Sequence, residues 1–317
     1  MRSNAKLAGL VLGGLLFCSS AQAGPLAWVT CQPANAVSVV DVDQMKEVAR
    51  IPVDGKPAGV AVSEPAGRVF VTSPEGKVLT ILDIARRSVD GRIPLEGGPL
   101  GVAVDPKGEV VYVADWYNHR IEVVDWKKGA IVDHIGVGQS PSGLDITPDG
   151  ALLLSADRDS DQVSFVDLAT RKVVATVHVG IRPFGVTIDA AGTRAYTANV
   201  GSNDLSVIDI AARKVIATVK TGERPYDVGL AAGKGFSTDQ YASTLTVFDE
   251  KTFQVVKTVD SGEYPEGIAA ARDGKAVYVA NWFDNTLLRL DPATLAVTGT
   301  ADVADGPRAF GKFLSGE

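Results

Sequence analysis

Several side chains that could bind a ligand fall in loops that recur along this chain at nearly constant spacing. Most are aromatic rings or guanidinium groups, at positions where a plain loop such as Val200–Asp204 needs only turn formers. Aromatic surface beside guanidinium donors suits a planar or anionic organic ligand, or the centre of a protein–protein interface. The alternative is that these rings only cover a channel mouth or pack on adjacent loops. We expect a ligand- or partner-binding face formed by Trp116, Tyr117, His119, Arg182, Phe184, Arg224, Tyr226, Tyr241, Tyr264, Trp282, Phe283 and Arg308.

Three carboxylates, Asp115, Asp157 and Asp239, occupy equivalent positions at the start of these loops. They could converge on a divalent cation or act as acid and base groups. Asn199 and Asn281 stand at the same position in other copies, which favours a structural role in which the side chain caps a hairpin. No metal site is therefore predicted, and these three residues are only weak candidates for one.

Cofactor motifs are missing from the sequence. There is no Cys-x-x-Cys-His, and Met45 is the only methionine after residue 23, which excludes covalent haem and a Met-rich copper site. Cys31 is the only cysteine after residue 23. It could be a nucleophile or a metal ligand, but we expect it to be a small buried residue. His119, His134 and His178 are too dispersed for a His-rich metal cluster, so no cofactor is predicted.

Two ladders of residues define the elements that position these loops. Prolines recur at Pro57, Pro99, Pro141, Pro183, Pro225, Pro265 and Pro307, and aspartates recur at Asp41, Asp83, Asp125, Asp167, Asp209, Asp249 and Asp291. Both ladders advance by 42 residues, with a single step of 40 that indicates a shortened turn near 231–234. Each unit contains four strand-like runs, such as Pro183–Ile188, Ala195–Ala198, Leu205–Ile208 and Lys214–Val219. Four strands in about forty residues predict one blade of an all-β, seven-bladed β-propeller.

The ends of the chain indicate how the ring closes. Only three strand-like runs precede Pro57, and the segment Pro307–Phe313 has the pattern of an inner strand without a blade of its own. We expect this segment to complete the four-stranded antiparallel N-terminal blade, because closure removes two open sheet edges. Residues 24–317 are thus predicted to form one domain.

The repeat units resemble a known family. The segments Val111–Trp116, Ala195–Asp209 and Val277–Thr286, which read VYVADW, AYTANVGSNDLSVID and VYVANWFDNT, are similar to the YVTN repeats of secreted and periplasmic bacterial β-propellers. The resemblance covers residues 26–313 and implies the propeller fold. It says little about chemistry, because propellers host enzymes, binding modules and scaffolds alike. Some proteins of this type resemble accessory components of quinone-cofactor-dependent alcohol oxidation.

Residues 1–23 are typical of a cleaved signal peptide: two basic residues, the apolar run Leu7–Phe17 and an A-x-A site at 21–23. Bulky Phe17 before Cys18 argues against a lipoprotein. We therefore expect a periplasmic protein, without membrane attachment after cleavage. Without residues 1–23 the chain carries 29 Lys and Arg against 38 Asp and Glu, about −9, which argues against binding nucleic acid. We expect a monomer.

These observations favour a periplasmic binding or accessory module for a small ligand or a periplasmic protein partner. Two alternatives remain open. One is a lactonase-like hydrolase whose channel-mouth carboxylates hold a cation that polarises a carbonyl group. The other is a scaffold that docks a quinoprotein (PQQ-linked) alcohol dehydrogenase or a transporter.

Overall fold

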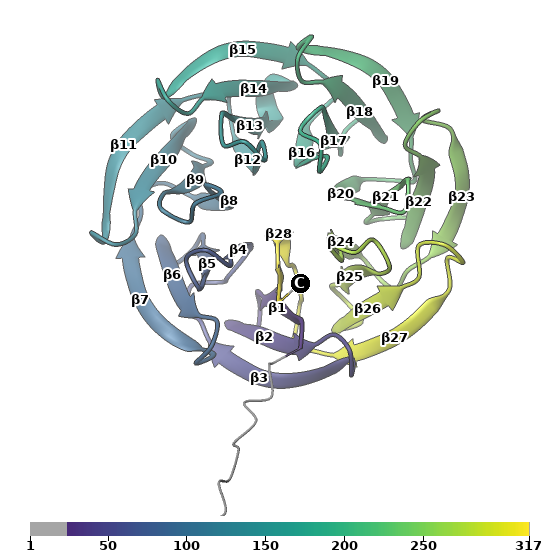
Figure 1. Cartoon of the computed structure of the whole chain (residues 1–317), viewed down its shortest axis with the longest axis horizontal. Coiled ribbons are helices and arrows are strands. Elements are labelled where there is room, and N and C mark those ends of the chain that lie inside the picture. Colours follow the sequence, from purple (N-terminus) through teal and green to yellow (C-terminus); the bar gives the residue numbers. More distant parts are fainter. Residues whose placement is uncertain (1–23, 317) are drawn as a thin grey trace, which may run out of the picture.

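Residues 24–316 of the computed structural model form seven blades of four antiparallel strands each around one axis, and one blade has a short fifth strand added in parallel (Figure 1). The second and third strands of each blade lie between two neighbouring blades, so they are buried on both faces; β18 (Asp204–Asp209) is buried at its first five residues. The fourth strands are at the rim and alternate between exposed and half-buried residues, as in β19 (Lys214–Lys220). This confirms the predicted fold class.

The blades follow one another in sequence order. Blade 2 consists of β4 (Gly59–Ser63), β5 (Arg68–Ser73), β6 (Val78–Asp83) and β7 (Ser88–Pro94). Blade 3 consists of β8 (Pro99–Val104), β9 (Val111–Asp115), β10 (Arg120–Asp125) and β11 (Ala130–Gly136). Blade 4 consists of β12 (Pro141–Ile146), β13 (Leu152–Asp157), β14 (Gln162–Asp167) and β15 (Lys172–His178), with the short helix η1 (Arg158–Ser160) after β13. Blade 5 consists of β16 (Pro183–Ile188), β17 (Arg194–Asn199), β18 and β19. Blade 6 consists of β20 (Pro225–Ala231), β21 (Lys234–Asp239), β22 (Thr244–Asp249) and β23 (Val255–Asp260). Blade 7 consists of β24 (Pro265–Ala270), β25 (Val277–Asn281), β26 (Thr286–Leu290) and β27 (Val297–Asp302).

Blade 1 joins the two ends of the chain, as predicted. Its order is β29 (Leu314–Ser315), β1 (Leu26–Cys31), β2 (Ala36–Asp41) and β3 (Lys46–Pro52). One detail differs from the expectation of a single continuous strand. Pro307 bridges Cys31 at the end of β1, the segment β28 (Phe310–Lys312) then pairs in parallel with β4 of blade 2, and the chain pairs with β1 again from Phe313 to β29. Gly311 permits this turn, because its φ of 119° is a conformation that other residues avoid.

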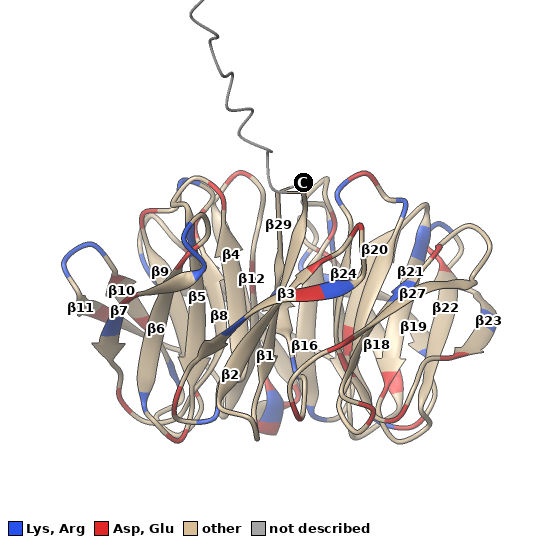
Figure 2. Cartoon of the chain, turned by 90° about the horizontal axis from the view of Figure 1, so that it is seen from below, with Lys and Arg blue, Asp and Glu red and all other residues tan. Residues whose placement is uncertain are grey.

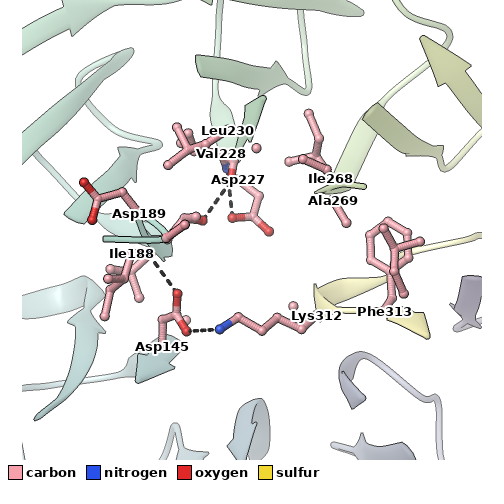
Figure 3. A pocket seen from close by; sticks show the side chains of 18 of the residues that line it. Asp145, Ile188, Asp189, Asp227, Val228, Leu230, Ile268, Ala269, Lys312 and Phe313 are labelled. Carbon is pink, nitrogen blue, oxygen red and sulfur yellow. Dashed lines mark hydrogen bonds and ion pairs between the residues drawn. The ribbon is translucent and has the colours of Figure 1, made fainter. Parts of the chain in front are cut away.

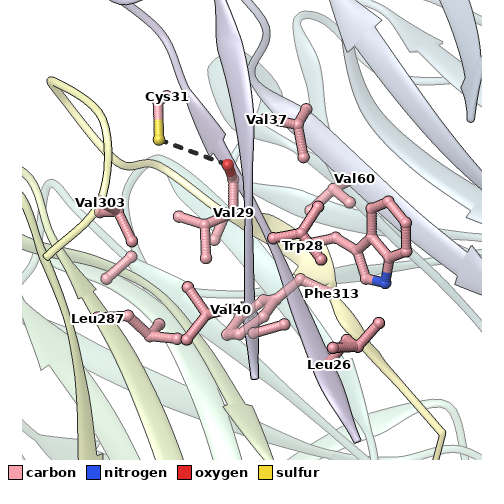
Figure 4. Close-up of a cluster of buried hydrophobic side chains, with 14 of the residues drawn as sticks. Leu26, Trp28, Val29, Cys31, Val37, Val40, Val60, Leu287, Val303 and Phe313 are labelled. Atoms are coloured by element: carbon pink, nitrogen blue, oxygen red, sulfur yellow. Dashed lines mark hydrogen bonds between the residues drawn. The ribbon is translucent and has the colours of Figure 1, made fainter. Parts of the chain in front are cut away.

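Side chains from both ends of the chain meet in the core of blade 1 (Figure 4). Trp28 and Phe313 are fully buried, beside Leu287 and Val303 from the blade 7 side. The Trp28 indole N–H donates to the Ser315 hydroxyl at 2.8 Å, and the Trp28 backbone N–H donates to the Phe313 carbonyl at 2.8 Å. Hydrophobic packing and hydrogen bonds together therefore close the ring.

The inner strands approach one another closely around the axis. A Cβ atom on Gly59 would lie 2.1 Å from the Leu100 carbonyl oxygen, and one on Gly101 would lie 2.0 Å from the Ser142 carbonyl oxygen. Glycine is therefore required at these positions. The 40-residue step is also explained: β20 and β21 are joined by Ala232 and Gly233 alone, both at positive φ, as in a two-residue hairpin turn.

The ladder aspartates cap the turns between third and fourth strands. The Asp41 carboxylate, for example, accepts the backbone N–H groups of Asp43 and Gln44 at 3.1 and 2.9 Å. The predicted signal peptide lies outside the described residues. None of the helices in residues 24–316 is long and apolar enough to cross a bilayer.

Replacement of Phe313 by alanine tests the closure. We expect Phe313→Ala to lower the free energy of unfolding by about 3–5 kcal/mol, because it opens a cavity at the junction of the two chain ends. Urea denaturation measures the loss. Val256→Ala, at a site that is 53% exposed, is the matched control and should cost less than about 0.5 kcal/mol. Equal stability of the two variants would contradict this account of closure.

Candidate functional site

The wheel has two different faces. One face carries the loops between second and third strands and the connections between blades, and we call it the connection face. The hairpin face is its opposite; it carries the other hairpin loops and both ends of the described chain, Gly24 and Gly316. The backbone N–H of Gly316 donates to Glu64 in the β4–β5 loop at 2.6 Å, and Figure 2 shows the C-terminus on this side. All residues of the predicted binding face belong to the connection face or its inner edge.

An aromatic plug fills the axial channel beside the connection face. Phe184, Tyr226 and Phe310 pack together with ring centroids 4.6 to 5.3 Å apart, and Trp116 lies 6.3 Å from Phe184. Phe184 and Tyr226 directly follow ladder prolines, so the repeat brings equivalent positions from neighbouring blades to the axis. Both are more than 90% buried. These rings act as the channel cover, which was the alternative considered for them.

An ion pair between a half-buried arginine and a buried glutamate extends the plug. Arg308 and Glu266 also directly follow ladder prolines, and Arg308 Nε lies 3.1 Å from Glu266 Oε2. The same nitrogen donates to the Tyr226 hydroxyl at 2.7 Å, while Gln240 donates to the second Glu266 oxygen at 2.6 Å. Burial raises the Glu266 pKa to about 7 despite the neighbouring guanidinium group. Arg308 is thus committed to a partner within the protein.

Exposed aromatic rings form a row on the connection face of blades 6 and 7. The guanidinium carbon of Arg224 lies 4.8 Å from the centroid of the Tyr241 ring, Tyr241 lies 5.7 Å from Tyr264, and Tyr264 lies 5.0 Å from Phe283. Tyr241 is 53% exposed and Phe283 62%. We call Arg224, Tyr241, Tyr264 and Phe283 the aromatic row. Tyr264, which lies between the two exposed rings, and Arg224 are half-buried.

The other predicted residues lie in several loops of the connection face. Tyr117 is 71% exposed, and Arg182 is exposed on the β15–β16 connection. His119 is exposed too, but its Nδ1 accepts the backbone N–H of Ser140 at 3.1 Å. Trp282 is half-buried, with its ring centroid 5.8 Å from the Arg308 guanidinium carbon. The structure therefore does not gather all twelve predicted residues into one pocket.

The three loop aspartates, Asp115, Asp157 and Asp239, accept hydrogen bonds from nearby groups of the protein. Asp157 accepts hydrogen bonds from the hydroxyls of Ser155 and Ser164 at 2.7 and 2.5 Å, and from the Gly138 N–H at 3.0 Å. Asp115 and Asp239 are equally buried and have comparable local partners. Within residues 24–316 they do not belong to any group of converging metal-ligand atoms. The structural role expected for them agrees with this geometry.

Cys31 is buried at the end of β1. Its thiol lies 3.4 Å from the Val29 carbonyl oxygen and 3.6 Å from the Ser38 hydroxyl. Burial raises the pKa of this thiol to about 11, so the nucleophilic thiolate is scarce at neutral pH.

A cavity of about 830 Å³ occupies the axis on the opposite side of the plug. Its wall comes from the inner strands of blades 2 to 7 and from β28, and its mouth lies among the hairpin loops at Pro106, Ala190 and Ala232. This volume falls within the range of ligand pockets. None of the sequence patterns described above predicts this cavity.

Two buried carboxyl groups, those of Asp145 and Asp227, and the Lys312 ammonium group line the cavity together with apolar side chains (Figure 3). Lys312 Nζ lies 2.7 Å from Asp145 Oδ1, and the second Asp145 oxygen accepts the Ile188 N–H at 2.8 Å. Asp227 accepts the Val228 N–H at 2.9 Å. Desolvation, together with the nearby Asp145 charge, raises the Asp227 pKa to about 8, whereas the Asp145 charge raises the pKa of Lys312.

A signal for these residues does exist in the sequence. Asp227 stands two residues after a ladder proline, where five of the other copies have glycine and one has alanine. Asp145 stands four residues after its ladder proline, where the other six copies have alanine, glycine or threonine. A carboxyl group buried at an inner-strand position costs free energy of folding unless it is hydrogen-bonded or paired with a cation.

Comparisons with known proteins support a propeller built of repeats. The NHL repeat model matches residues 97–124. The "uncharacterized protein YncE" of Salmonella typhi and that of Salmonella typhimurium strain LT2 are each 40% identical over 47 residues, which is 15% of this chain. The match spans only 13% of the length of these relatives. These findings fit a β-propeller repeat protein, while the YVTN type stays a prediction.

Solved structures show the same fold at low identity. A functionally unknown protein from Desulfotomaculum acetoxidans is 16% identical, with a TM-score of 0.76 over 90% of this chain and 99% of that one. Dihydro-heme d1 dehydrogenase NirN in complex with DHE is 15% identical, with a TM-score of 0.67 over 92% of this chain and 75% of NirN. Kuenenia stuttgartiensis hydrazine synthase is 18% identical, with a TM-score of 0.55 over 75% and 96%. Function does not follow from fold alone.

The electrostatics of Asp227 can be tested by stability against pH. Because its folded pKa of about 8 exceeds the unfolded value of about 4, the folded state holds the proton more tightly between these values, and wild-type stability falls as pH rises through them. Asp227→Asn removes this loss. Urea denaturation should therefore show the variant gaining more than about 1 kcal/mol relative to wild type between pH 5 and pH 9. Parallel pH profiles would contradict the assigned ionisation.

Proposed function

We propose that this propeller is a binding protein that holds a small organic cation in its axial cavity. The observation that carries the proposal is a pair of buried carboxyl groups in the wall of a cavity of ligand size, of which, within residues 24–316, only Asp145 forms an ion pair with a cationic side chain. We further propose that the protein works in the periplasm, on the strength of the pattern in residues 1–23.

The charge balance of the cavity favours a cation. Lys312 neutralises Asp145, and Asp227 has no cationic partner among the hydrogen bonds and ion pairs of the described chain. In the ligand-free protein Asp227 avoids a buried charge by keeping its proton. An ammonium group from a ligand would supply the missing charge. The other charged groups that line the cavity are Asp189, Glu250 and Arg272.

The rest of the wall favours an apolar body on the ligand. Val186, Ile188, Val228, Leu230 and Ile268 line the cavity from three successive blades. Phe310 of the plug closes its inner end, and Phe313 lines the side next to blade 1. An arylalkyl or branched alkyl ammonium ion would bury its hydrocarbon part here, at roughly 25 cal/mol for each Å² removed from water.

Calorimetric titration of the whole protein with phenethylammonium chloride tests this proposal. Phenethyl alcohol and 3-phenylpropionate serve as the neutral and anionic probes of similar shape. We expect only the cation to bind at pH 7.5. Asp227→Asn should weaken its affinity about tenfold or more, because a charge-assisted contact is worth about 1.5–3 kcal/mol. Glu75→Gln, on the connection face, is the matched control and should leave binding unchanged.

The pH dependence adds a second readout. Asp227 must lose its proton to pair with a cation, so affinity should rise between pH 6 and pH 9. A neutral ligand that accepts a hydrogen bond from the protonated carboxyl group would show the opposite trend. Preference for the alcohol, or equal binding by wild type and Asp227→Asn, would overturn the proposal.

The aromatic row supports a second candidate function, the docking of a protein partner on the connection face. The plug fills the centre of this face, which leaves exposed rings beside a guanidinium group on a surface without an axial opening. Tyrosine, phenylalanine and arginine are enriched at protein–protein interfaces. A protein surface fits this arrangement better than a small molecule does.

Crosslinking in periplasmic extract tests this second candidate. We expect Tyr241→Ala combined with Phe283→Ala to abolish a stoichiometric crosslinked complex, because the variant removes the two most exposed rings of the row. Tyr117→Ala, which removes an exposed ring from blade 3, is the control. Loss of the complex in the control alone, or its persistence in the double variant, would contradict docking on the row.

A further inference from the structure

A group of metal-ligand atoms lies on the outer part of blade 3, away from both sites described above. Glu122 on β10 and His134 on β11 are register partners, and Glu96 comes from the connection between β7 and β8. One ligand atom from each lies within 4.8 Å of those from the other two. In residues 24–316 this is the only group of three such side chains that meets this criterion.

The buried carboxyl group of Glu122 lacks a partner on one side. Its side chain is fully buried, and Oε1 accepts the backbone N–H of Glu96 at 3.0 Å. Oε2 has no hydrogen-bond partner within the described part of the chain. An unpaired buried polar atom costs about 1–3 kcal/mol, and more when it is charged. Desolvation and the nearby Asp115 charge raise the Glu122 pKa to about 7.

The repeat shows that blade 3 does not need these residues for its fold. At the position of Glu122, the other copies have Ser38, Thr80, Ser164, Ser206, Thr246 and Leu288. In blades 4 and 6 this hydroxyl simply bonds to the aspartate at the end of the second strand. Threonine or arginine replaces His134 in every other copy. Blade 3 alone combines two carboxylates and an imidazole at these three positions.

The surrounding charges also leave room for a cation. Arg120 contacts both Asp115 and Glu96, and its nearest guanidinium nitrogen is 3.8 Å from Glu122 Oε1. Three carboxyl groups therefore share one guanidinium group. Arg120 can remain on Asp115 when Glu96 turns to a metal, because its Nε already donates to Asp115 Oδ2 at 3.1 Å.

We propose that Glu96, Glu122 and His134 bind a divalent transition-metal ion, and that the donor set favours Zn²⁺. One imidazole nitrogen and two carboxylate oxygens are common zinc ligands, and a water molecule would complete a tetrahedral site. Bound there, the ion joins β10, β11 and the connection from blade 2. Its role is to hold the rim of blade 3 to the neighbouring blade.

Calorimetric titration of tag-free, chelator-treated protein with ZnCl₂ tests the site, with MgCl₂ as the oxygen-preferring control ion. We expect one Zn²⁺ per chain and a rise in the melting temperature, without a comparable effect of Mg²⁺. Glu122→Thr and His134→Thr each introduce a residue that other copies carry, and each should weaken Zn²⁺ binding by at least about tenfold.

Two controls make the result decisive. His178→Thr removes an exposed histidine from the rim of blade 4 and should leave Zn²⁺ binding unchanged. Metal-free Glu122→Thr should melt no lower than metal-free wild type, since it removes an unpaired buried carboxyl group, so a loss of binding would not reflect unfolding. The proposal is overturned if Zn²⁺ does not bind, if both site variants bind it as wild type does, or if His178→Thr alone abolishes binding.

Discussion

The junction between the two ends of the chain is the constraint on which the rest of the structure depends. Blade 1 takes three strands from the N-terminal end and its inner strand from residues 307–315, so this blade also has four strands and the ring is closed. Fully buried Trp28 and Phe313 join these ends in one core. Because each blade packs only on its neighbours, an open ring would expose two apolar blade faces and would no longer hold the inner strands around a common axis.

The closed ring explains why the two ends of the channel differ. Residues that directly follow the ladder prolines meet at one end; large side chains such as Phe184 and Tyr226 fill it there. Farther along the same strands, small and branched residues leave the axial cavity. One repeat geometry therefore produces a plug and a cavity, depending on which side chains occupy successive positions.

The residues that depart from the repeat carry most of the functional inference. Asp227 replaces a residue that is otherwise glycine or alanine, and Glu122 replaces a residue that is mostly serine or threonine. Each places a carboxyl group in a buried position at a cost in free energy, and its environment raises its pKa. Neither is required by the blade fold, since the other copies form the same sheets without it. Perturbed ionisable groups of this kind are more frequent at functional sites than elsewhere.

The sequence by itself determined the number of blades, their order and closure by the C-terminal segment, because these follow from local periodicity and from the pairing of edges. It also predicted that aromatic and arginine residues gather on one face. Only the tertiary structure decided which of them are accessible: Phe184 is buried in the plug and Arg308 is half-buried in an ion pair with Glu266, whereas Tyr241 and Phe283 stay exposed. The cavity beside Asp145 and Asp227 was likewise beyond the sequence, because its walls come from strands far apart in the chain. The direction of a side chain at the axis depends on its neighbours in other blades, and no local pattern records those neighbours.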